Sequence, residues 1–141
     1  MGFHTKPATF VGHVKIKVEN LERSLKFYQE ILGFQVLEQT TSTAKLTTDG
    51  NTSFLSLEQP EHVIPNQGRT SGLFHFAILL PKRSDLANLL IHFREDGRQF
   101  FAAEDHQVSE ALYLNDPDGN GIEIYADRDP STWTWKGTEV D

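Results

Sequence analysis

The sequence contains no cysteine, and this absence excludes several kinds of chemistry at once. Disulfide bonds, thiolate metal ligands and cysteine nucleophiles all require a thiol, so a metal site would have to use other side chains. Basic residues are also few, since 13 Lys and Arg stand against 20 Asp and Glu, for a formal net charge of −7. Proteins that bind the nucleic-acid backbone need a basic surface, so we expect no nucleic-acid partner.

Long apolar runs are missing as well. A membrane-spanning helix needs about 20 consecutive apolar residues, and a signal peptide needs a shorter apolar segment near the N-terminus. We therefore expect no membrane partner and a cytoplasmic location. What is present suits a globular protein, because 38% of the 141 residues are hydrophobic and 11% are aromatic. A chain of this length can bury a core, so we expect a single domain over residues 1–141.

One structural plan occurs twice along the chain. The segments 12–18 and 75–80 both alternate in the way typical of half-buried strands, and each carries a His at or near its start. A helical pattern follows each strand, with Asn20 and Ser84 as expected N-caps and Gly33 and Gly97 as expected ends. The two His are separated by almost the same number of residues as the two glycines, which indicates a duplicated unit.

Three short strand-like runs follow each helix. We predict them at about residues 34–39, 44–48 and 53–58 in the first half, and 99–102, 111–115 and 121–126 in the second. Each half then reads βαβββ, and the fold class is α+β, with two tandem βαβββ modules forming a curved mixed sheet. Module one covers about residues 10–58, a linker 59–72, module two 73–126 and a C-terminal tail 127–141. We expect the tail either to dock through its tryptophans or to begin a linker.

Strand alternation assigns the polar residues of module two to one face of the sheet. Ile122 and Ile124 need burial against the helix, so Glu123 and Tyr125 point to the opposite face. The same alternation places Tyr113 on the face that carries Glu123. It also predicts that the aromatic residues at positions 74 and 76 lie in the core.

The two repeated His residues complete a candidate metal site. His13 and His75 lie opposite the apolar faces of their strands, and therefore on the face that carries Glu123. A single His on a strand is more often a surface residue, but two at matched positions beside a carboxylate favour a metal site. Such a set suits Fe(II), Mn(II), Ni(II) or Zn(II), so we predict a metal cavity with the ligands His13, His75 and Glu123. The position matching Glu123 in module one is Ser56, a poor ligand, so we expect three protein ligands instead of four.

Several stretches resemble the vicinal oxygen chelate superfamily, which includes glyoxalases, bleomycin resistance proteins and extradiol dioxygenases. They read "GHVKIKV", "LERSLKFYQEILGF", "FHFAILL" and "LYLNDPDGNGIEIY", and the resemblance covers residues 11–126. The last stretch is the most specific, because a tight Asp-Pro-Asp-Gly-Asn turn leads into a strand that carries a carboxylate. Within the superfamily, "GLFHFAILLP" and "DHQVSEALYLNDPDGNGIEIYADR" most resemble the N-terminal half of bacillus-type catechol 2,3-dioxygenases.

The resemblance implies extradiol ring cleavage of a catechol-like diol by O2, with a role in aromatic catabolism. Fe(II) is then the metal expected first, and the three ligands of that family fall on His13, His75 and Glu123. A second-sphere tyrosine of the family falls on Tyr113, and its acid–base histidine on His106. His106 would exchange a proton with the catechol, and Tyr113 would hydrogen-bond an oxygen at the metal.

Other functions within the resemblance stay open. One is a glyoxalase-like isomerase, a lyase or a thiol-transfer enzyme, and another is a non-catalytic protein that binds a small aromatic molecule or an antibiotic. Glyoxalase I has a fourth ligand where this chain has Ser56, which favours the dioxygenase. We expect a homodimer, in which the site forms either within one chain or across the two-fold axis.

Overall fold

The protein is described by a computed structural model that covers residues 10–68, 71–95 and 102–140. It divides into two compact units, Met1–Gln67 and Gly68–Asp141, and the boundary falls inside the predicted linker 59–72. Each unit holds one helix and one four-stranded sheet in its described part. Among these residues no helix is long and apolar enough to cross a membrane.

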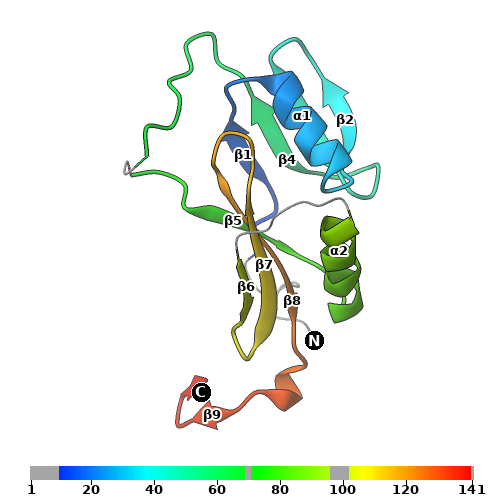
Figure 1. Ribbon diagram of the computed structural model, residues 1–141, viewed down its shortest axis with the longest axis vertical. Coiled ribbons are helices and arrows are strands. Elements are labelled where there is room, and N and C mark those ends of the chain that lie inside the picture. The colour runs from blue at the N-terminus through cyan, green and yellow to red at the C-terminus, as the bar shows by residue number, and fades with distance from the viewer. Residues whose placement is uncertain (1–9, 69–70, 96–101, 141) are drawn as a thin grey trace. The chain divides into compact units, whose positions relative to one another are not determined.

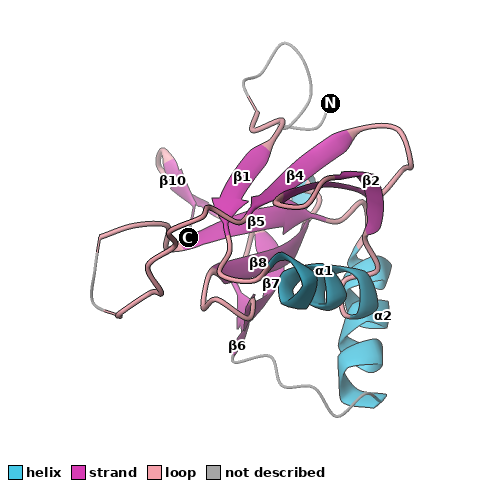
Figure 2. Cartoon of the chain, turned by 90° about the horizontal axis from the view of Figure 1, so that it is seen from above, coloured by secondary structure: helices cyan, strands magenta, loops and turns pink. Residues whose placement is uncertain are grey.

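Unit one follows the βαβββ plan. Its elements are β1 (Val14–Lys17), α1 (Leu21–Glu30), β2 (Gln35–Gln39), β3 (Thr43–Thr47) and β4 (Ser53–Glu58). The sheet order is β1-β4-β3-β2, in which β1 and β4 are parallel and the other neighbours are antiparallel. Figure 2 shows β1 and β4 running side by side.

Unit two repeats this plan and adds a tail (Figure 1). Its elements are β5 (His75–Leu79), α2 (Arg83–Glu95), β6 (Ala102–Asp105), β7 (Ser109–Asn115) and β8 (Gly121–Asp127), and then η1 (Pro130–Thr132), β9 (Trp135–Lys136) and β10 (Glu139–Val140). The sheet order, β5-β8-β7-β6, matches that of unit one strand for strand. The predicted α+β fold of two tandem βαβββ modules is therefore confirmed, with the mixed sheet present as two sheets of four strands.

Helix α1 begins and ends where its sequence predicts. The Asn20 side chain accepts a hydrogen bond of 2.9 Å from the Arg23 backbone N–H and so caps the first turn. Leu25 and Tyr28 lie on the buried face of the helix. Gly33 follows the last turn with a φ of +71°, in the left-handed region that a glycine adopts without a steric penalty.

Helix α2 begins two residues earlier than predicted, because Ser84 lies inside the helix instead of capping it. The helix starts at Arg83, and the Asp85 N–H donates to the Lys82 carbonyl at 3.0 Å. The Arg83 side chain extends to Glu110 on β7 and forms an ion pair with it. The predicted end of the helix at Gly97 lies outside the described residues.

One further expectation for module two was wrong, and another is tested only in part. The strand predicted at 99–102 is described over Ala102–Asp105, where backbone pairing with β7 continues to Asp105. Residues 99–101 themselves fall outside the described ranges. Phe74 was expected in the core but is 87% exposed, whereas Phe76 is buried. Phe74 precedes the first paired residue of β5, so the alternation of the strand does not yet govern it.

The core of unit two lies between α2 and the sheet. Helix α2 packs on β7 and β8, and it buries Leu86 and Phe93. On the strands, Leu112 lies opposite Ile124 and both side chains are buried. The helix-facing residues of the sheet are thus the ones that the alternation predicts, which leaves the other face for polar side chains.

Candidate functional site

The parallel pairing of β5 with β8 brings His75 next to Glu123. His75 lies opposite Gly121 and Ala77 lies opposite Glu123 in the register of the two strands. The His75 Nε2 atom is 3.1 Å from the Glu123 Oε2 atom, and the two side chains are 32% and 14% exposed. Two residues predicted as metal ligands are therefore in direct contact at the start of this sheet.

Gly121 permits this close approach of the two strands. A Cβ atom at position 121 would lie 2.4 Å from the Phe74 carbonyl oxygen and 2.9 Å from the His75 Cβ. Contacts that short do not occur in folded proteins, and the nearest atom belongs to the backbone, which side-chain rotation cannot move away. The sequence reasoning did not single out Gly121. Its signal was a glycine at the first position of a strand, which often marks a close backbone approach.

The geometry of this pair fits a bound metal ion. Ligand atoms at the usual nitrogen and oxygen distances from one divalent ion lie roughly 2.9 to 3.4 Å apart, depending on the angle at the metal. The observed 3.1 Å between the two atoms falls in that range. The His75 Nδ1 atom, on the other side of the ring, is buried and has no hydrogen-bond partner among the described residues. A metal ion at Nε2 would not supply that partner, so the fit rests on the distance between Nε2 and the Glu123 carboxylate.

Tyr113 and His106 extend the site along the same face. Tyr113 lies opposite Glu123 in the antiparallel register of β7 and β8, and its ring meets the His75 ring edge to face at 6.1 Å. The Tyr113 hydroxyl is 2.9 Å from the His106 Nε2 atom. His106, which the resemblance implies to be the acid–base residue, is thus hydrogen-bonded to the implied second-sphere residue Tyr113, which neighbours a predicted metal ligand.

The direction of these hydrogen bonds follows from the chemistry of the groups. Burial, and then a hydrogen bond to Glu123, raise the pKa of Tyr113 to about 12, so the phenol keeps its proton at neutral pH. An ionised carboxylate only accepts, so the single Tyr113 O–H donates to Glu123. The Tyr113 oxygen then accepts from an Nε2–H of His106. The three groups form a chain from His106 to the carboxylate.

Module one holds a matching but altered pair. Lys15 lies opposite Ser56 in the parallel pairing of β1 and β4, as Ala77 lies opposite Glu123 in module two. Ser56 therefore occupies the position of Glu123, as the sequence predicts. The His13 Nε2 atom is 3.0 Å from the Ser56 hydroxyl oxygen, and its Nδ1 atom is 3.1 Å from the Ser53 carbonyl oxygen. The duplicated His is retained, but its carboxylate neighbour is a hydroxyl.

The complete three-ligand set stays a prediction. Over residues 10–68, 71–95 and 102–140, no three His, Asp or Glu side chains gather in a group that could hold a metal ion. The pair His75 and Glu123 belongs to one compact unit, and His13 belongs to the other. Of the three predicted ligands, therefore, only His75 and Glu123 support a metal site through a contact between them.

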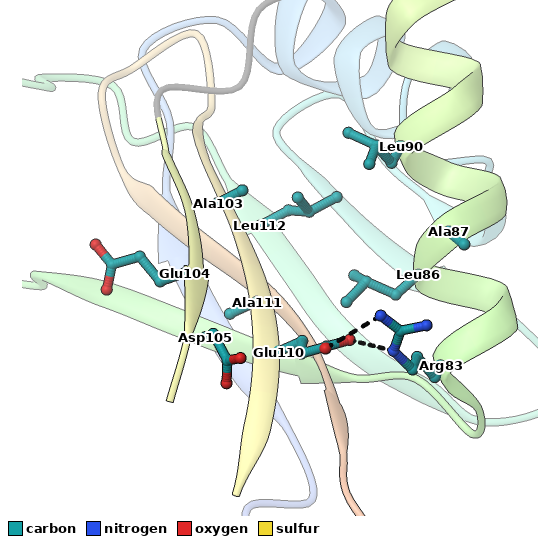
Figure 3. Close-up of a pocket in the computed structure, with 10 residues that line it drawn as sticks. All are labelled: Arg83, Leu86, Ala87, Leu90, Ala103, Glu104, Asp105, Glu110, Ala111 and Leu112. Carbon is teal, nitrogen blue, oxygen red and sulfur yellow. Dashed lines mark hydrogen bonds and ion pairs between the residues drawn. The ribbon is translucent and has the colours of Figure 1, made fainter. Parts of the chain in front are cut away.

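A separate cavity of about 310 Å³ lies on the helix side of the sheet in unit two. Figure 3 shows Leu86 and Leu90 of α2 pointing toward Leu112 of β7, with the ion pair of Arg83 and Glu110 at one edge. Leu112 neighbours Tyr113 in β7, so the two side chains point to opposite faces. The cavity therefore does not belong to the face that carries His75 and Glu123.

Comparison with known proteins agrees with the fold. The sequence profile of the Glyoxalase/Bleomycin resistance protein/Dioxygenase superfamily matches residues 10–124. A crystal structure of a glyoxalase/dioxygenase from Nostoc punctiforme superimposes with a TM-score of 0.69 at 20% sequence identity, covering 85% of this chain and 92% of that one. At this identity the match concerns the fold.

Three curated relatives span different activities. A catechol-2,3-dioxygenase from Bacillus subtilis (strain 168) is 51% identical over 126 residues, which is 89% of this chain and 44% of that protein. Biphenyl-2,3-diol 1,2-dioxygenase 3 from Rhodococcus globerulus is 29% identical, with 83% and 63% covered. Metallothiol transferase FosB from Lysinibacillus sphaericus (strain C3-41) is 26% identical, with 82% and 80% covered. The chain thus spans about half the length of the two dioxygenases.

Proposed function

Because this chain belongs to the Glyoxalase/Bleomycin resistance protein/Dioxygenase superfamily, we propose that it is a metal-dependent dioxygenase that opens the ring of a catechol-like diol with O2. The observation that carries the proposal is the His75–Glu123 contact of 3.1 Å beside the hydrogen-bonded Tyr113 and His106. The 51% identity to a catechol-2,3-dioxygenase supports the same reaction.

In this proposal His13 joins His75 and Glu123 as the third ligand of the metal. The duplication supports this assignment, because β1 and β5 are equivalent strands and His13 precedes Lys15 as His75 precedes Ala77. Two imidazoles and one carboxylate suit Fe(II) first, with Mn(II), Ni(II) or Zn(II) as alternatives. When bound, such an ion would hold both oxygens of a catechol and supply the electron transfer from the ring to O2.

The side chains of the protein would transfer protons and orient the substrate. With the His106 Nε2–H donating to the Tyr113 oxygen, the other ring nitrogen, Nδ1, would take a proton from the catechol and return it later in the reaction, as a general acid–base does. The Tyr113 oxygen would hold the protonated His106 ring toward the site. Its O–H, which donates to Glu123 in the free protein, would turn to an oxygen of the substrate when that carboxylate binds the metal. The raised pKa of Tyr113 keeps this group a donor throughout the neutral range.

The test is a single-turnover experiment under controlled O2. The protein is purified without air, loaded with Fe(II) and mixed with catechol and O2, and the yellow ring-opened product is followed by its absorbance. We expect product with the native chain and none with His75→Ala or Glu123→Gln, whereas His62→Ala, a change at an exposed residue of the linker, should behave as the native chain does. Metal binding without product from any catechol would contradict the proposal.

A thiol-transfer or isomerase reaction is the second candidate. The observation that favours it is the 26% identity to a metallothiol transferase over 82% of this chain. Such a reaction would use the metal to polarise an oxygen of the substrate and would need no O2. Turnover of a thiol substrate in the absence of O2 would favour this candidate. A protein that binds an aromatic ligand and turns over nothing would indicate a binding role.

A further inference from the structure

The turn that carries His106 has a backbone conformation that needs support. This turn joins β6 to β7, and its residue Gln107 has a φ of +67°. Side chains other than glycine rarely adopt this left-handed conformation, and they keep it only where the surroundings hold it. Within the turn, the His106 N–H donates to the Ser109 carbonyl at 2.9 Å. The direction of the His106 ring therefore depends on whatever stabilises the turn.

Arg128, the residue after β8, holds the turn from both sides of His106. Its Nη2 atom donates to the Asp105 carboxylate at 2.7 Å, and its Nη1 atom donates to the Gln107 carbonyl at 3.4 Å. Its backbone N–H donates to the Val108 carbonyl at 2.8 Å. One residue thus contacts the position before His106 and the two positions after it.

Further contacts fix Arg128 itself. Its Nη2 atom also donates to Glu110 at 2.8 Å, and its backbone carbonyl accepts a hydrogen bond of 3.2 Å from the Trp133 indole N–H. Asp105 is fixed in turn, since its carboxylate accepts from the Gln107 N–H at 2.8 Å. That hydrogen bond, followed by the one from Arg128, lowers the pKa of Asp105, so its charge is retained at neutral pH.

The His106 ring has few restraints of its own. Its Nε2 atom meets the Tyr113 hydroxyl at 2.9 Å and lies 3.7 Å from the exposed Glu104 carboxylate. The ring can hold the Tyr113 contact only while the backbone turn keeps it in place. We propose that Arg128 is a positioning residue, which locks the β6–β7 turn so that His106 stays hydrogen-bonded to Tyr113 and oriented toward the substrate. This inference rests on the proposed acid–base function of His106.

Arg83 supplies a matched control. It is a second arginine that pairs with Glu110, and among the described residues its hydrogen bonds go to Glu110 and not to the turn. Arg83→Ala and Arg128→Ala therefore both remove one cationic partner of Glu110, and only the second also removes the support of the turn. Arg128→Lys keeps the charge but loses the two-sided donor geometry of the guanidinium, so it should recover part of the function.

The first readout needs neither metal nor substrate. The ring signals of His106 are recorded by NMR, and the change caused by Tyr113→Phe reports the hydrogen bond between the two side chains. We expect a clear change in the native background and in Arg83→Ala, and little change in Arg128→Ala. A full response in a folded Arg128→Ala chain would overturn the inference. If Arg128→Ala does not fold, the same measurement is made in Arg128→Lys. A change in the His106 signals as large as in the native background would then also overturn the inference.

The second readout is activity with Fe(II) and catechol. Misplacing a catalytic group can cost about 10- to 100-fold in rate, so Arg128→Ala should lower kcat by that order with a smaller effect on KM. Arg83→Ala should retain the native kcat. His106→Ala distinguishes the proposed acid–base role of His106 from the proposed positioning role of Arg128. If it leaves kcat unchanged, the acid–base role fails, whereas a large loss for His106→Ala combined with none for Arg128→Ala refutes the positioning role alone.

Discussion

Replacing Gly121 with alanine tests whether the close approach of β5 and β8 determines the candidate site. The added Cβ would lie 2.4 Å from the Phe74 carbonyl oxygen and 2.9 Å from the His75 Cβ. Neither atom belongs to the end of a flexible side chain, so the strands themselves must separate. Because His75 lies opposite Gly121 in the register, the separation acts directly on the contact between His75 and Glu123.

Two opposing effects determine how much Gly121→Ala changes the free energy of unfolding. Replacing glycine with alanine restricts the unfolded chain and would by itself stabilise the folded protein by about 0.4–1 kcal/mol. Overpacking a well-packed site costs about 1–3 kcal/mol, and the upper part of that range applies where backbone obstructs. The cost of the clash should therefore exceed the gain, and we expect a net loss of about 1–2.6 kcal/mol in the free energy of unfolding.

Urea unfolding measures this loss, and a metal titration of the folded variant measures its effect on the site. Gly72→Ala is the matched control, because a Cβ there would meet nothing within 4 Å and its φ lies outside the left-handed region. That control should be neutral or slightly stabilising, with unchanged metal binding. A Gly121→Ala chain as stable as the native one, and equally able to bind metal, would refute the packing argument.

Two further changes test the elements around the site. Asn20→Ala removes the cap of α1 and should lower the free energy of unfolding by about 1 kcal/mol in urea, while Asn20→Asp should retain it, and equal losses in both would contradict the capping role. The hydrogen bonds from Arg83 and Arg128 lower the pKa of Glu110. The ionised Glu110 side chain therefore stabilises the folded protein above the usual carboxyl pKa, and this contribution is lost as the pH falls through the lowered pKa of the folded state. Melting temperatures between neutral and acidic pH should therefore fall less steeply for Glu110→Gln than for the native chain, and identical slopes would contradict this.

Much of the fold could be predicted because duplication and alternation are local signals. The cap at Asn20 and the end at Gly33 follow from side-chain chemistry at the helix termini. The start of α2 could not be predicted in the same way, because Ser84, the polar residue that suggested a cap, lies inside the helix. Phe74 shows the limit of alternation, because a strand pattern says nothing about the residue before pairing begins.

The candidate site could also be predicted only in part, namely where local sequence patterns determine it. Alternation and the repeat placed Glu123, Tyr113 and His75 on one face, and the structure brings these three together. Arg128 could not be found from the sequence, because its contacts with the β6–β7 turn depend on how β8 ends beside it. The strain at Gln107 is equally invisible in a sequence that has no glycine at this turn.

Metal binding by defined variants tests the central claim most directly. The native chain is freed of metal and titrated with Fe(II) without air, and Mn(II) is used in parallel so that binding can be followed by electron paramagnetic resonance. We predict one ion per chain, tight binding lost in His75→Ala, Glu123→Gln and His13→Ala, and native binding in His62→Ala. Undiminished binding in both His75→Ala and Glu123→Gln, or no binding of any divalent ion by the native chain, would contradict the account.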